Sequence, residues 1–478
     1  MQQESDIILV VDLDGTLVKS DMLFESFWSV ISKQPSLIFK FFYDFGHGGL
    51  AYLKEKIANI YELDASMIPY NQAIIDLILE RKSKGSKVAL VTASDQKVAE
   101  NIAKYLGLFD EVFASDGHQN LKGNIKANLL IKQYGAKNFD YVGNSRADIP
   151  VWNKARRVIT SNIDPILRKR TSKIYPNIKH MNHTKLKMIS YVAALRPHQW
   201  VKNALIFLPA ISSAQIFSTD IFMTLCISFI AFSLVASSGY LFNDLLDLEA
   251  DRNHPEKKTR PLAAGQISLL YSTLLIFVLL VIGSLIALLF VNIKFFLILS
   301  TYFLLTTIYS LYLKRKIIID IVSLAGLYTL RVIAGGLAVD LPLSVWILAF
   351  SMFIFMSLAA VKRLSELVEN ASKGQKNTVG RSYKTSDITI IGGISLASGY
   401  ISVLVSILHI YTEATQEFYS RPEILLGICP ILIYWITRMI LLTHRGEMHH
   451  DPILFSIRDN TSRFSIFLII LIAIVAKV

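Results

Sequence analysis

The second half of the chain consists mainly of long apolar stretches that alternate with short charged loops. A membrane hydrocarbon core is about 30 Å thick, so a crossing helix needs roughly 20 predominantly apolar residues. Nine stretches approach that length, at about 199–217, 220–243, 268–291, 294–313, 318–339, 343–361, 388–411, 423–443 and 461–478. The first is the weakest because Lys202, Asn203 and Pro209 interrupt it. These stretches predict an all-α polytopic membrane bundle of about nine transmembrane helices.

Lysine and arginine are distributed unequally between the loops that join these stretches. If the segment before residue 199 is cytoplasmic, the loops on the opposite side contain only Lys294, Arg421 and Lys477. Positively charged loops tend to remain in the cytoplasm. We therefore expect the N-terminal part on the cytoplasmic side of a cell inner membrane or plasma membrane. The net charge of +12 then reflects orientation and contacts with lipid phosphates, and it does not indicate a nucleic-acid partner.

An acidic motif lies between the second and third apolar stretches, where residues 243–252 read NDLLDLEADR. Its aspartates are spaced i, i+3 and i+7, which places them on one helical face: Asp244, Asp247 and Asp251. Mg²⁺ favours a few carboxylates together with water and phosphate oxygens. Cations suited to an anionic leaving group follow in the loop, namely Lys257, Lys258 and Arg260. A solvated acidic helix end beside a basic loop is the simpler interpretation, but acids at the mouth of a membrane bundle favour function.

The NDxxDxxxD pattern resembles the first aspartate motif of the UbiA-type intramembrane prenyltransferase superfamily, over about residues 190–478. The resemblance implies a helical bundle whose central cavity binds a magnesium–diphosphate complex through Asn243, Asp244, Asp247 and Asp251. Members that transfer a prenyl group usually carry a second motif, DxxxD, on a later helix. Here Asp320 has Leu324 where the second aspartate belongs. The sequence therefore departs from the prenyl-transferring pattern.

Four further segments resemble the decaprenyl-phosphate phosphoribosyltransferase branch of cell-wall biosynthesis: 195–203, 260–265, 330–336 and 362–367. In that branch a lipid monophosphate attacks C1 of phosphoribosyl pyrophosphate, and pyrophosphate leaves. The resemblance implies extra groups for the two phosphates, and the candidate substrate-binding residues are Asn243, Lys202, Lys257, Arg260, Tyr309, Arg331, Lys362 and Arg363. Several of these cations are also explained as helix ends or a loop anchor. Arg331, in the middle of a predicted helix, favours function.

The N-terminal region contains short apolar strands that end in polar motifs. Residues 7–11 precede a DxDGT motif that contains Asp12 and Asp14, and a second strand ends at Thr92. Lys126 follows, and a third strand leads into residues 143–148, GNSRAD. Ligands bind at the carboxyl ends of strands in open α/β sheets. The strand ends therefore indicate a site.

This ordered set resembles the haloacid dehalogenase (HAD)-type phosphatases over about residues 5–165. The resemblance implies an α/β, Rossmann-type domain with a small helical cap at about 20–80. It makes Asp12 the nucleophile and Asp14 the general acid/base, with Thr92 and Lys126 on the phosphoryl group. The implied Mg²⁺ residues are Asp12, Asp14, Asn144 and Asp148. Asn144 stands where the family usually has aspartate, which predicts weaker metal binding.

Three parts follow from these observations: a HAD-like domain at 1–165, a basic linker at 166–190 and a transmembrane transferase domain at 191–478. The sequence predicts a Mg²⁺-dependent enzyme that transfers 5-phosphoribosyl from phosphoribosyl pyrophosphate to a polyprenyl phosphate at the cytoplasmic membrane face. The HAD domain would remove the 5-phosphate from the product. Two alternatives remain open. One is a prenyltransferase that acts on a prenyl diphosphate, and the other is a catalytically inactive lipid-binding scaffold.

Overall fold

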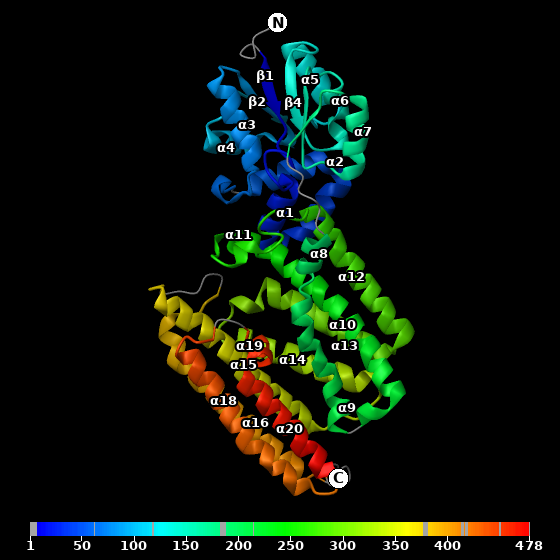
Figure 1. Ribbon diagram of the computed structural model, residues 1–478, viewed down its shortest axis with the longest axis vertical. Coiled ribbons are helices and arrows are strands. Elements are labelled where there is room, and N and C mark those ends of the chain that lie inside the picture. The colour runs from blue at the N-terminus through cyan, green and yellow to red at the C-terminus, as the bar shows by residue number, and fades with distance from the viewer. Residues whose placement is uncertain are drawn as a thin grey trace. The chain divides into compact units, whose positions relative to one another are not determined.

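The computed structural model describes residues 7–61, 63–116, 119–181, 188–213, 215–375, 381–412, 415, 419–448 and 451–477 (Figure 1). The chain forms two compact units. The first contains Met1–Leu195 and Leu241–Leu274, and the second contains Arg196–Tyr240 and Leu275–Val478. The acidic motif is thus grouped with the N-terminal region, although the sequence placed it in the membrane domain.

A six-stranded parallel sheet is the centre of the first unit. Its strands, in the order β3-β2-β1-β4-β5-β6, are β1 (Ile8–Val11), β2 (Val88–Asp95), β3 (Glu111–Ser115), β4 (Phe139–Gly143), β5 (Val158–Ser161) and β6 (Lys179–Met181). Both faces are covered, because Leu9 and Val11 pack in one apolar cluster whereas Ile8 and Val10 pack in another. Burial on two faces explains why β1 is uninterruptedly apolar. The predicted α/β class is confirmed.

Helices cover both faces of this sheet. They are α3 (Gln72–Ser83), α4 (Gln96–Leu106), α5 (Asn124–Tyr134), α6 (Ile149–Trp152) and α7 (Pro165–Ile174). The segment expected to form the cap contains α1 (Met22–Lys33) and α2 (Leu37–Ile60), and α2 is interrupted at Gly49, where φ is +68°. The expected cap range ends inside α3, whose Ile74, Leu77 and Ile78 pack in the core of the sheet.

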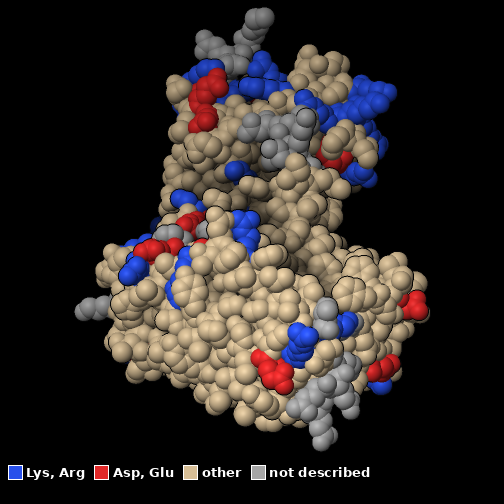
Figure 2. All heavy atoms as spheres, turned by 60° about the horizontal axis from the view of Figure 1, so that its bottom comes forward, with Lys and Arg blue, Asp and Glu red and all other residues tan. Residues whose placement is uncertain are grey.

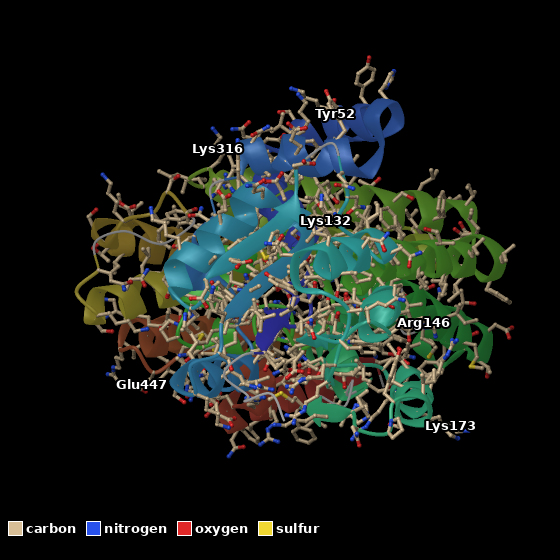
Figure 3. All side chains as sticks on the ribbon, turned by 90° about the horizontal axis from the view of Figure 1, so that it is seen from above. Tyr52, Lys132, Arg146, Lys173, Lys316 and Glu447 are labelled. Carbon is tan, nitrogen blue, oxygen red and sulfur yellow. The ribbon has the colours of Figure 1, made fainter. Side chains whose placement is uncertain are left out.

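The expected linker at 166–190 begins inside the α/β fold. Helix α7 buries Leu167 and Thr171, and β6 is the last strand of the sheet. The basic residues of α7 lie on its exposed side, and Lys173 projects from the first unit (Figure 3). A basic helix face therefore resembled a linker in the sequence. Residues 182–187 of the predicted linker lie outside the described residues.

The second unit is helical, and eight of the described helices are long and apolar enough to cross a membrane. Six are α10 (Thr219–Leu246), α12 (Leu269–Phe290), α13 (Ile293–Leu311), α14 (Ile319–Ala338), α15 (Val345–Ser372) and α20 (Asn460–Lys477). The other two are α16 (Ile388–Ile410) and α18 (Ile428–His444), each extended by a preceding 3₁₀ turn to span Thr385–Ile410 and Pro422–His444. Many large apolar side chains are exposed on them, and Figure 2 shows a face with few charges. Such a surface suits lipid. The chain is a multi-pass membrane protein.

The first predicted stretch, residues 199–217, is not a regular α-helix. Its described residues form the 3₁₀ helix η4 (Pro197–Phe207), α9 (Leu208–Ser212) and the 3₁₀ turn η5 (Gln215–Phe217). It still runs along the bundle, because Lys202 contacts Asp451, before α19 (Pro452–Arg458), whereas Phe217 lies beneath Lys477 at the end of α20. The expected count of nine therefore becomes eight long helices and one irregular segment in the described part of the chain.

A close helix contact holds this irregular segment against α14. A Cβ atom at Gly335 would lie 1.9 Å from the carbonyl oxygen of Ile206 in η4, and such an overlap is impossible without backbone movement. Gly326, on the same helix, has no atom within 4 Å of its would-be Cβ. Gly335 therefore has no room for a side chain, whereas Gly326, on the same helix, has room and serves as a control.

We expect Gly335→Ala to destabilise the protein by about 1–3 kcal/mol, because the new methyl group overpacks a backbone contact. Gly326→Ala should be neutral or stabilising by up to about 1 kcal/mol, because alanine favours a helix over glycine. Thermal unfolding in detergent measures both changes. Equal melting temperatures for the two variants would contradict the close approach of η4 and α14.

Candidate functional site

The carboxyl end of β1 carries the buried pair Asp12–Lys126. The Lys126 ammonium donates to Asp12 Oδ1 at 2.6 Å, and it lies 3.9 Å from Asp148 Oδ1. Burial raises the pKa of Asp12 above its ordinary value, and Lys126 offsets this effect only in part because Asp148 and Asp14 add negative charge. The residues expected to provide a nucleophile and a phosphoryl-binding lysine are therefore in contact.

Asp14 is held as a hydrogen-bond acceptor by two elements. Its Oδ1 accepts from the backbone nitrogen of Met22 at 2.8 Å, at the start of α1. Its Oδ2 accepts from Ser94 Oγ at 2.6 Å and from Thr92 Oγ1 at 3.4 Å. The site prediction did not include Ser94. Its signal was its position two residues after Thr92, since alternate strand residues share a face.

The loop after β4 brings Asp148 and Asn144 to the same site. Asp148 Oδ1 accepts from the Tyr141 hydroxyl at 2.7 Å, and Oδ2 accepts from the backbone nitrogens of Asn144 and Ser145 at 3.1 and 3.0 Å. Asn144 lies against the DxDGT loop, because a Cβ at Gly15 would be 2.0 Å from Asn144 Nδ2. Gly15, with φ +71°, therefore admits the asparagine. The structure places all six predicted residues of this site together.

The charge of this site fits a divalent cation. Asp21 and Lys54, from the cap segment, interact electrostatically with Asp14. Together with Asp12 and Asp148, these two aspartates form a group of four carboxylates, which outnumber the ammonium groups of Lys54, Lys122 and Lys126. Hard oxygen donors with an excess negative charge are the ligands that Mg²⁺ prefers. Among the described residues, however, no three acidic, histidine or cysteine side chains are spaced for a metal ion.

The acidic motif begins on the last turns of α10 and continues into α11 (Leu248–Asn253). Asp244 and Asp251 are both buried, and both contact Nη1 of Arg260, at 3.3 and 2.6 Å. Asp247 Oδ2 instead accepts from Asn243 Nδ2 at 3.0 Å. Two of the three aspartates therefore contact the same cation, the guanidinium group of Arg260. The cation found there belongs to their own loop, as in the simpler sequence interpretation.

Arg260 does not fully compensate these carboxylates. Burial raises the pKa of Asp251 to about 6. Arg260 offsets this rise only in part, and the negative charge of Asp244 adds to it. Mg²⁺ usually binds proteins through one or two carboxylates and completes its shell with water and substrate phosphates. Asp244 and Asp251 therefore fit a magnesium–diphosphate complex. They do not form a metal cage made of protein groups alone.

In the second unit, Asp451 joins two of the predicted cations. Lys202 of η4 donates to Asp451 Oδ2 at 2.6 Å, and Lys362 of α15 donates to the same oxygen at 3.1 Å. Burial raises the pKa of Asp451, but Lys362 and Lys202 more than offset this effect and hold it well below its ordinary value. Asp451 was missed because an isolated acid in a loop carries no motif. Asp451 could have been found as an acidic residue next to a predicted membrane helix, where a buried lysine or arginine needs a counter-ion.

Arg331 is buried on α14 beside aromatic rings. It donates to Asn203 Oδ1 and to the Tyr302 hydroxyl, both at 2.9 Å, and its guanidinium lies 5.3 Å from the Tyr328 ring. Lys202 lies 5.8 Å from that ring. No carboxylate of the described residues forms an ion pair with Arg331. Among the described residues, Asp451 is the carboxylate within ion-pair distance of Lys202 and Lys362, so this group carries more positive than negative charge.

Arg363 and Tyr309 form a separate cluster around Asp320. Arg363 Nε donates to Asp320 Oδ2 at 2.5 Å, and the Tyr309 hydroxyl donates to Oδ1 at 2.8 Å. Arg381, which the sequence did not single out, lies 3.2 Å from Oδ2. Both Asp320 oxygens are therefore held by donors. Asp320, beside Leu324, does not provide the second carboxylate cluster of the prenyl-transferring pattern.

We expect Asp451→Asn to destabilise the protein by about 2–4 kcal/mol, because it leaves the buried Lys202 and the partly exposed Lys362 without a counter-ion. The native contribution is full at neutral pH, since a lowered aspartate pKa stabilises above its ordinary value of 3.8 and the effect disappears only in stronger acid. Asp340→Asn is the control, because its ion pair with Lys294 is exposed and should matter by less than about 1 kcal/mol. Denaturant unfolding in detergent at pH 7 compares them. Similar small losses would contradict a buried cluster.

Comparison with known proteins adds the following similarities. Residues 204–451 match the UbiA prenyltransferase family, and residues 9–152 match the haloacid dehalogenase-like hydrolases. An uncharacterized protein, y4nM, of Sinorhizobium fredii is 34% identical over 459 residues, which cover 95% of this chain and 88% of y4nM. Nodulation protein NoeC of Azorhizobium caulinodans is 33% identical over 281 residues, or 58% of this chain and 90% of NoeC.

A third relative is the decaprenyl-phosphate phosphoribosyltransferase of Mycolicibacterium smegmatis. It is 36% identical over 182 residues, which cover 37% of this chain and 56% of that enzyme. The similarity to y4nM therefore spans nearly the whole chain, whereas the similarity to the mycobacterial enzyme covers a limited part of it.

Proposed function

Because the chain belongs to the UbiA prenyltransferase family and carries an N-terminal HAD-like domain, we propose that it is a polyprenyl-phosphate phosphoribosyltransferase. An oxygen of the lipid phosphate forms a bond to C1 of phosphoribosyl pyrophosphate, and the bond from C1 to pyrophosphate breaks. The observation that carries the proposal is Asp320, whose oxygens are held by Arg363, Arg381 and Tyr309. A single aspartate motif suits one diphosphate leaving group and a monophosphate acceptor.

The aspartate motif binds the leaving group in this proposal. Members of both families typically depend on Mg²⁺. Asp244 and Asp251 would hold the ion, with Asp247 and Asn243 beside them, and the bound ion would neutralise the charge on pyrophosphate. Arg260 and Lys257 add positive charge in the same loop. These residues stabilise the departing anion, which is the main electrostatic requirement of the reaction.

The cations of the second unit bind the remaining phosphates. Lys202, Lys362 and Arg331 carry more positive charge than Asp451 compensates, which suits a phosphate monoester dianion. The hydrogen-bonding partners of these cations would hold a bound phosphate in a defined orientation. No general base is required, because a phosphate oxygen is already ionised at neutral pH. Catalysis therefore depends on charge neutralisation and positioning.

We further propose that the HAD-like domain hydrolyses the 5-phosphate of the lipid-linked product. The similarity to the smegmatis enzyme supports the first step, and the Asp12–Lys126 and Asp14–Ser94 contacts support the second. Asp12 forms a bond to phosphorus as the bond from phosphorus to the sugar oxygen breaks, and Asp14 protonates that oxygen. Water then hydrolyses the aspartyl-phosphate, which releases phosphate and restores Asp12. Placing both activities on one chain raises the effective concentration of the intermediate. Both sites would lie on the cytoplasmic side of an inner or plasma membrane.

A prenyltransferase that joins a prenyl diphosphate to another acceptor is the second candidate, because the family match is compatible with it. It requires binding of a prenyl diphosphate without the second aspartate motif. The inactive-scaffold alternative requires that the buried, paired carboxylates of both sites have no substrate. Labelled substrates distinguish the three candidates directly.

With phosphoribosyl pyrophosphate that carries ¹⁴C in its ribose, together with polyprenyl phosphate, we expect Mg²⁺-dependent entry of label into the lipid fraction. Asp244→Asn should lower this transfer by on the order of 10²-fold or more, because a leaving-group ligand is lost. Asp12→Asn should leave transfer intact but abolish release of the 5-phosphate. Release of pyrophosphate from a prenyl diphosphate, with transfer of the prenyl group to an added acceptor and no entry of ribose into lipid, would favour the second candidate. No transfer of either kind would favour the scaffold.

Asn144→Asp should strengthen Mg²⁺ binding at the phosphatase site. The substitution adds a negative charge beside Asp12 and Asp148, so we expect the Mg²⁺ concentration for half-maximal hydrolysis to fall by about tenfold or more. Hydrolysis of p-nitrophenyl phosphate at varied Mg²⁺ measures this change. Asn144→Ala is the control, and a similar Mg²⁺ requirement for both variants would contradict a ligand role at position 144.

A further inference from the structure

Helix α1 lies along the aspartate loop within the first unit. The α1 residues that contact the loop are spaced by three and four positions, and so they share one helical face: Glu25, Trp28, Ser29 and Lys33. Their partners extend from Phe242, before the motif, to Thr273, after it. One face of α1 therefore contacts both ends of the loop and its middle.

The strongest of these contacts is a buried, bidentate ion pair. Arg252 Nη1 and Nη2 donate to the two Glu25 carboxylate oxygens at 3.0 and 2.6 Å, and the side chains are 9% and 4% exposed. Arg252 Nε also donates to the carbonyl oxygen of Ala263 at 3.1 Å. Arg252 thus joins the outgoing arm of the loop, its returning arm and α1. It directly follows Asp251 in the sequence.

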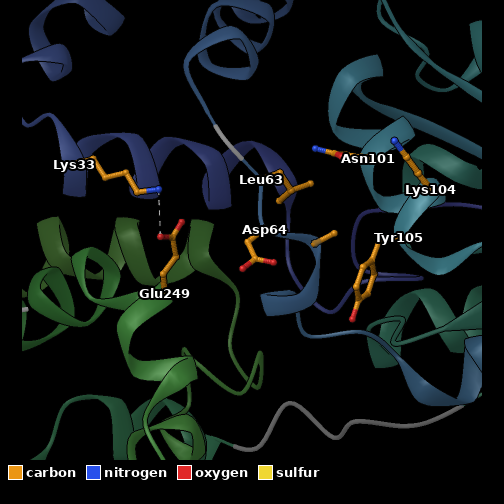
Figure 4. Close-up of a pocket in the computed structure, with 8 residues that line it drawn as sticks. Lys33, Leu63, Asp64, Asn101, Lys104, Tyr105 and Glu249 are labelled. Atoms are coloured by element: carbon orange, nitrogen blue, oxygen red, sulfur yellow. Dashed lines mark ion pairs between the residues drawn. The ribbon is translucent and has the colours of Figure 1, made fainter. Parts of the chain in front are cut away.

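Polar and aromatic contacts surround this ion pair. Trp28 Nε1 donates to Thr273 Oγ1 at 3.1 Å, and its ring meets Phe242 edge-on at 5.8 Å. Ser29 hydrogen-bonds Glu249, which also pairs with exposed Lys33 at 3.5 Å. Figure 4 shows Lys33 and Glu249 at the edge of an open pocket. The contact therefore has a buried ion pair and a solvent-exposed one on the same loop.

The opposite end of α1 reaches the phosphatase-like site. The backbone nitrogen of Met22, the first residue of α1, donates to Asp14 Oδ1 at 2.8 Å. Glu25 follows three residues later and binds Arg252. One short helix therefore contacts the acid/base residue of one proposed site and the metal-binding loop of the other.

We propose that Glu25 and Arg252 are positioning residues for phosphoribosyl transfer, and that the N-terminal domain is a structural part of the transferase. This inference rests on the proposed function. The ion pair fixes Arg252, and so it fixes the neighbouring Asp251 relative to Arg260 and Asp244. The domain is then required for transfer independently of its own hydrolysis.

The physical reason lies in the low polarity around the pair. Removal of one partner leaves the other charge buried without compensation, so the loop must rearrange to hydrate it. Catalysis of this kind depends on placement, and a shift of about 1 Å can reduce the rate by on the order of 10²-fold. Loss of Glu25 should therefore act on the affinity of the loop for Mg²⁺ and pyrophosphate.

Glu25→Gln, in the full-length protein, keeps the shape of the side chain and removes its charge. We expect the Mg²⁺ concentration for half-maximal transfer to rise at least tenfold. Lys33→Met is the matched control, because it removes the exposed ion pair to the same loop and should change this value by less than twofold.

Exchange of the two charges tests positioning against general damage. Glu25→Arg alone should nearly abolish transfer. The double variant Glu25→Arg/Arg252→Glu should have a transfer rate at least tenfold higher than that of Glu25→Arg. A Glu25→Gln variant that resembles wild type, or a double variant no better than Glu25→Arg, would overturn the inference.

Hydrogen exchange separates this inference from the proposed function. We expect faster amide exchange at residues 248–264 in Glu25→Gln than in wild type or Lys33→Met, whether or not transfer is detected. Equal exchange in all three proteins overturns the positioning role. Absence of transfer in wild type, with faster exchange in Glu25→Gln, overturns only the proposed chemistry.

Discussion

The need to compensate buried charge governs both units of this protein. Buried acids in both units lie beside cations: Asp12 beside Lys126, Asp251 beside Arg260, Asp451 beside Lys202 and Asp320 beside Arg363. An isolated charge in a medium of low polarity is strongly unfavourable. These pairs therefore restrict how the surrounding strands and helices pack. Removal of one partner leaves the other charge buried without compensation, which destabilises the fold.

Compensation is incomplete where the proposed ligands bind. Carboxylates exceed ammonium groups around Asp12, and burial raises the pKa of Asp251 despite Arg260. Around Lys202 and Arg331, cations exceed carboxylates. Around Asp320 the charges are matched, because Arg363 and Arg381 pair with two carboxylates, Asp320 and Glu366. The sign of the excess charge therefore distinguishes three kinds of cluster. An excess of negative charge suits a divalent cation, an excess of positive charge suits a phosphate, and matched charges suit a structural role.

The sequence predictions that differed from the structure share a physical cause. Residues 199–217 have nearly the length of a transmembrane helix, but Lys202 and Asn203 bind partners within the bundle, and the segment is partly 3₁₀. The stretch at 166–190 is basic because α7 exposes its charged face while Leu167 is buried in the sheet. The composition of a segment indicates only how polar the segment is on average. It does not reveal which side of an element meets a neighbour.

The sequence by itself determined the two fold classes, the alternation of apolar spans and charged loops, and the motifs that contain Asp12, Asp244 and Arg331, because periodicity and local spacing depend only on near neighbours along the chain. Only the tertiary structure decided that Arg260 lies between Asp244 and Asp251, that Asp451 joins Lys202 to Lys362, and that Glu25 binds Arg252. These contacts join residues up to 249 positions apart. No local pattern encodes them, since they arise when packing brings distant charges together away from water.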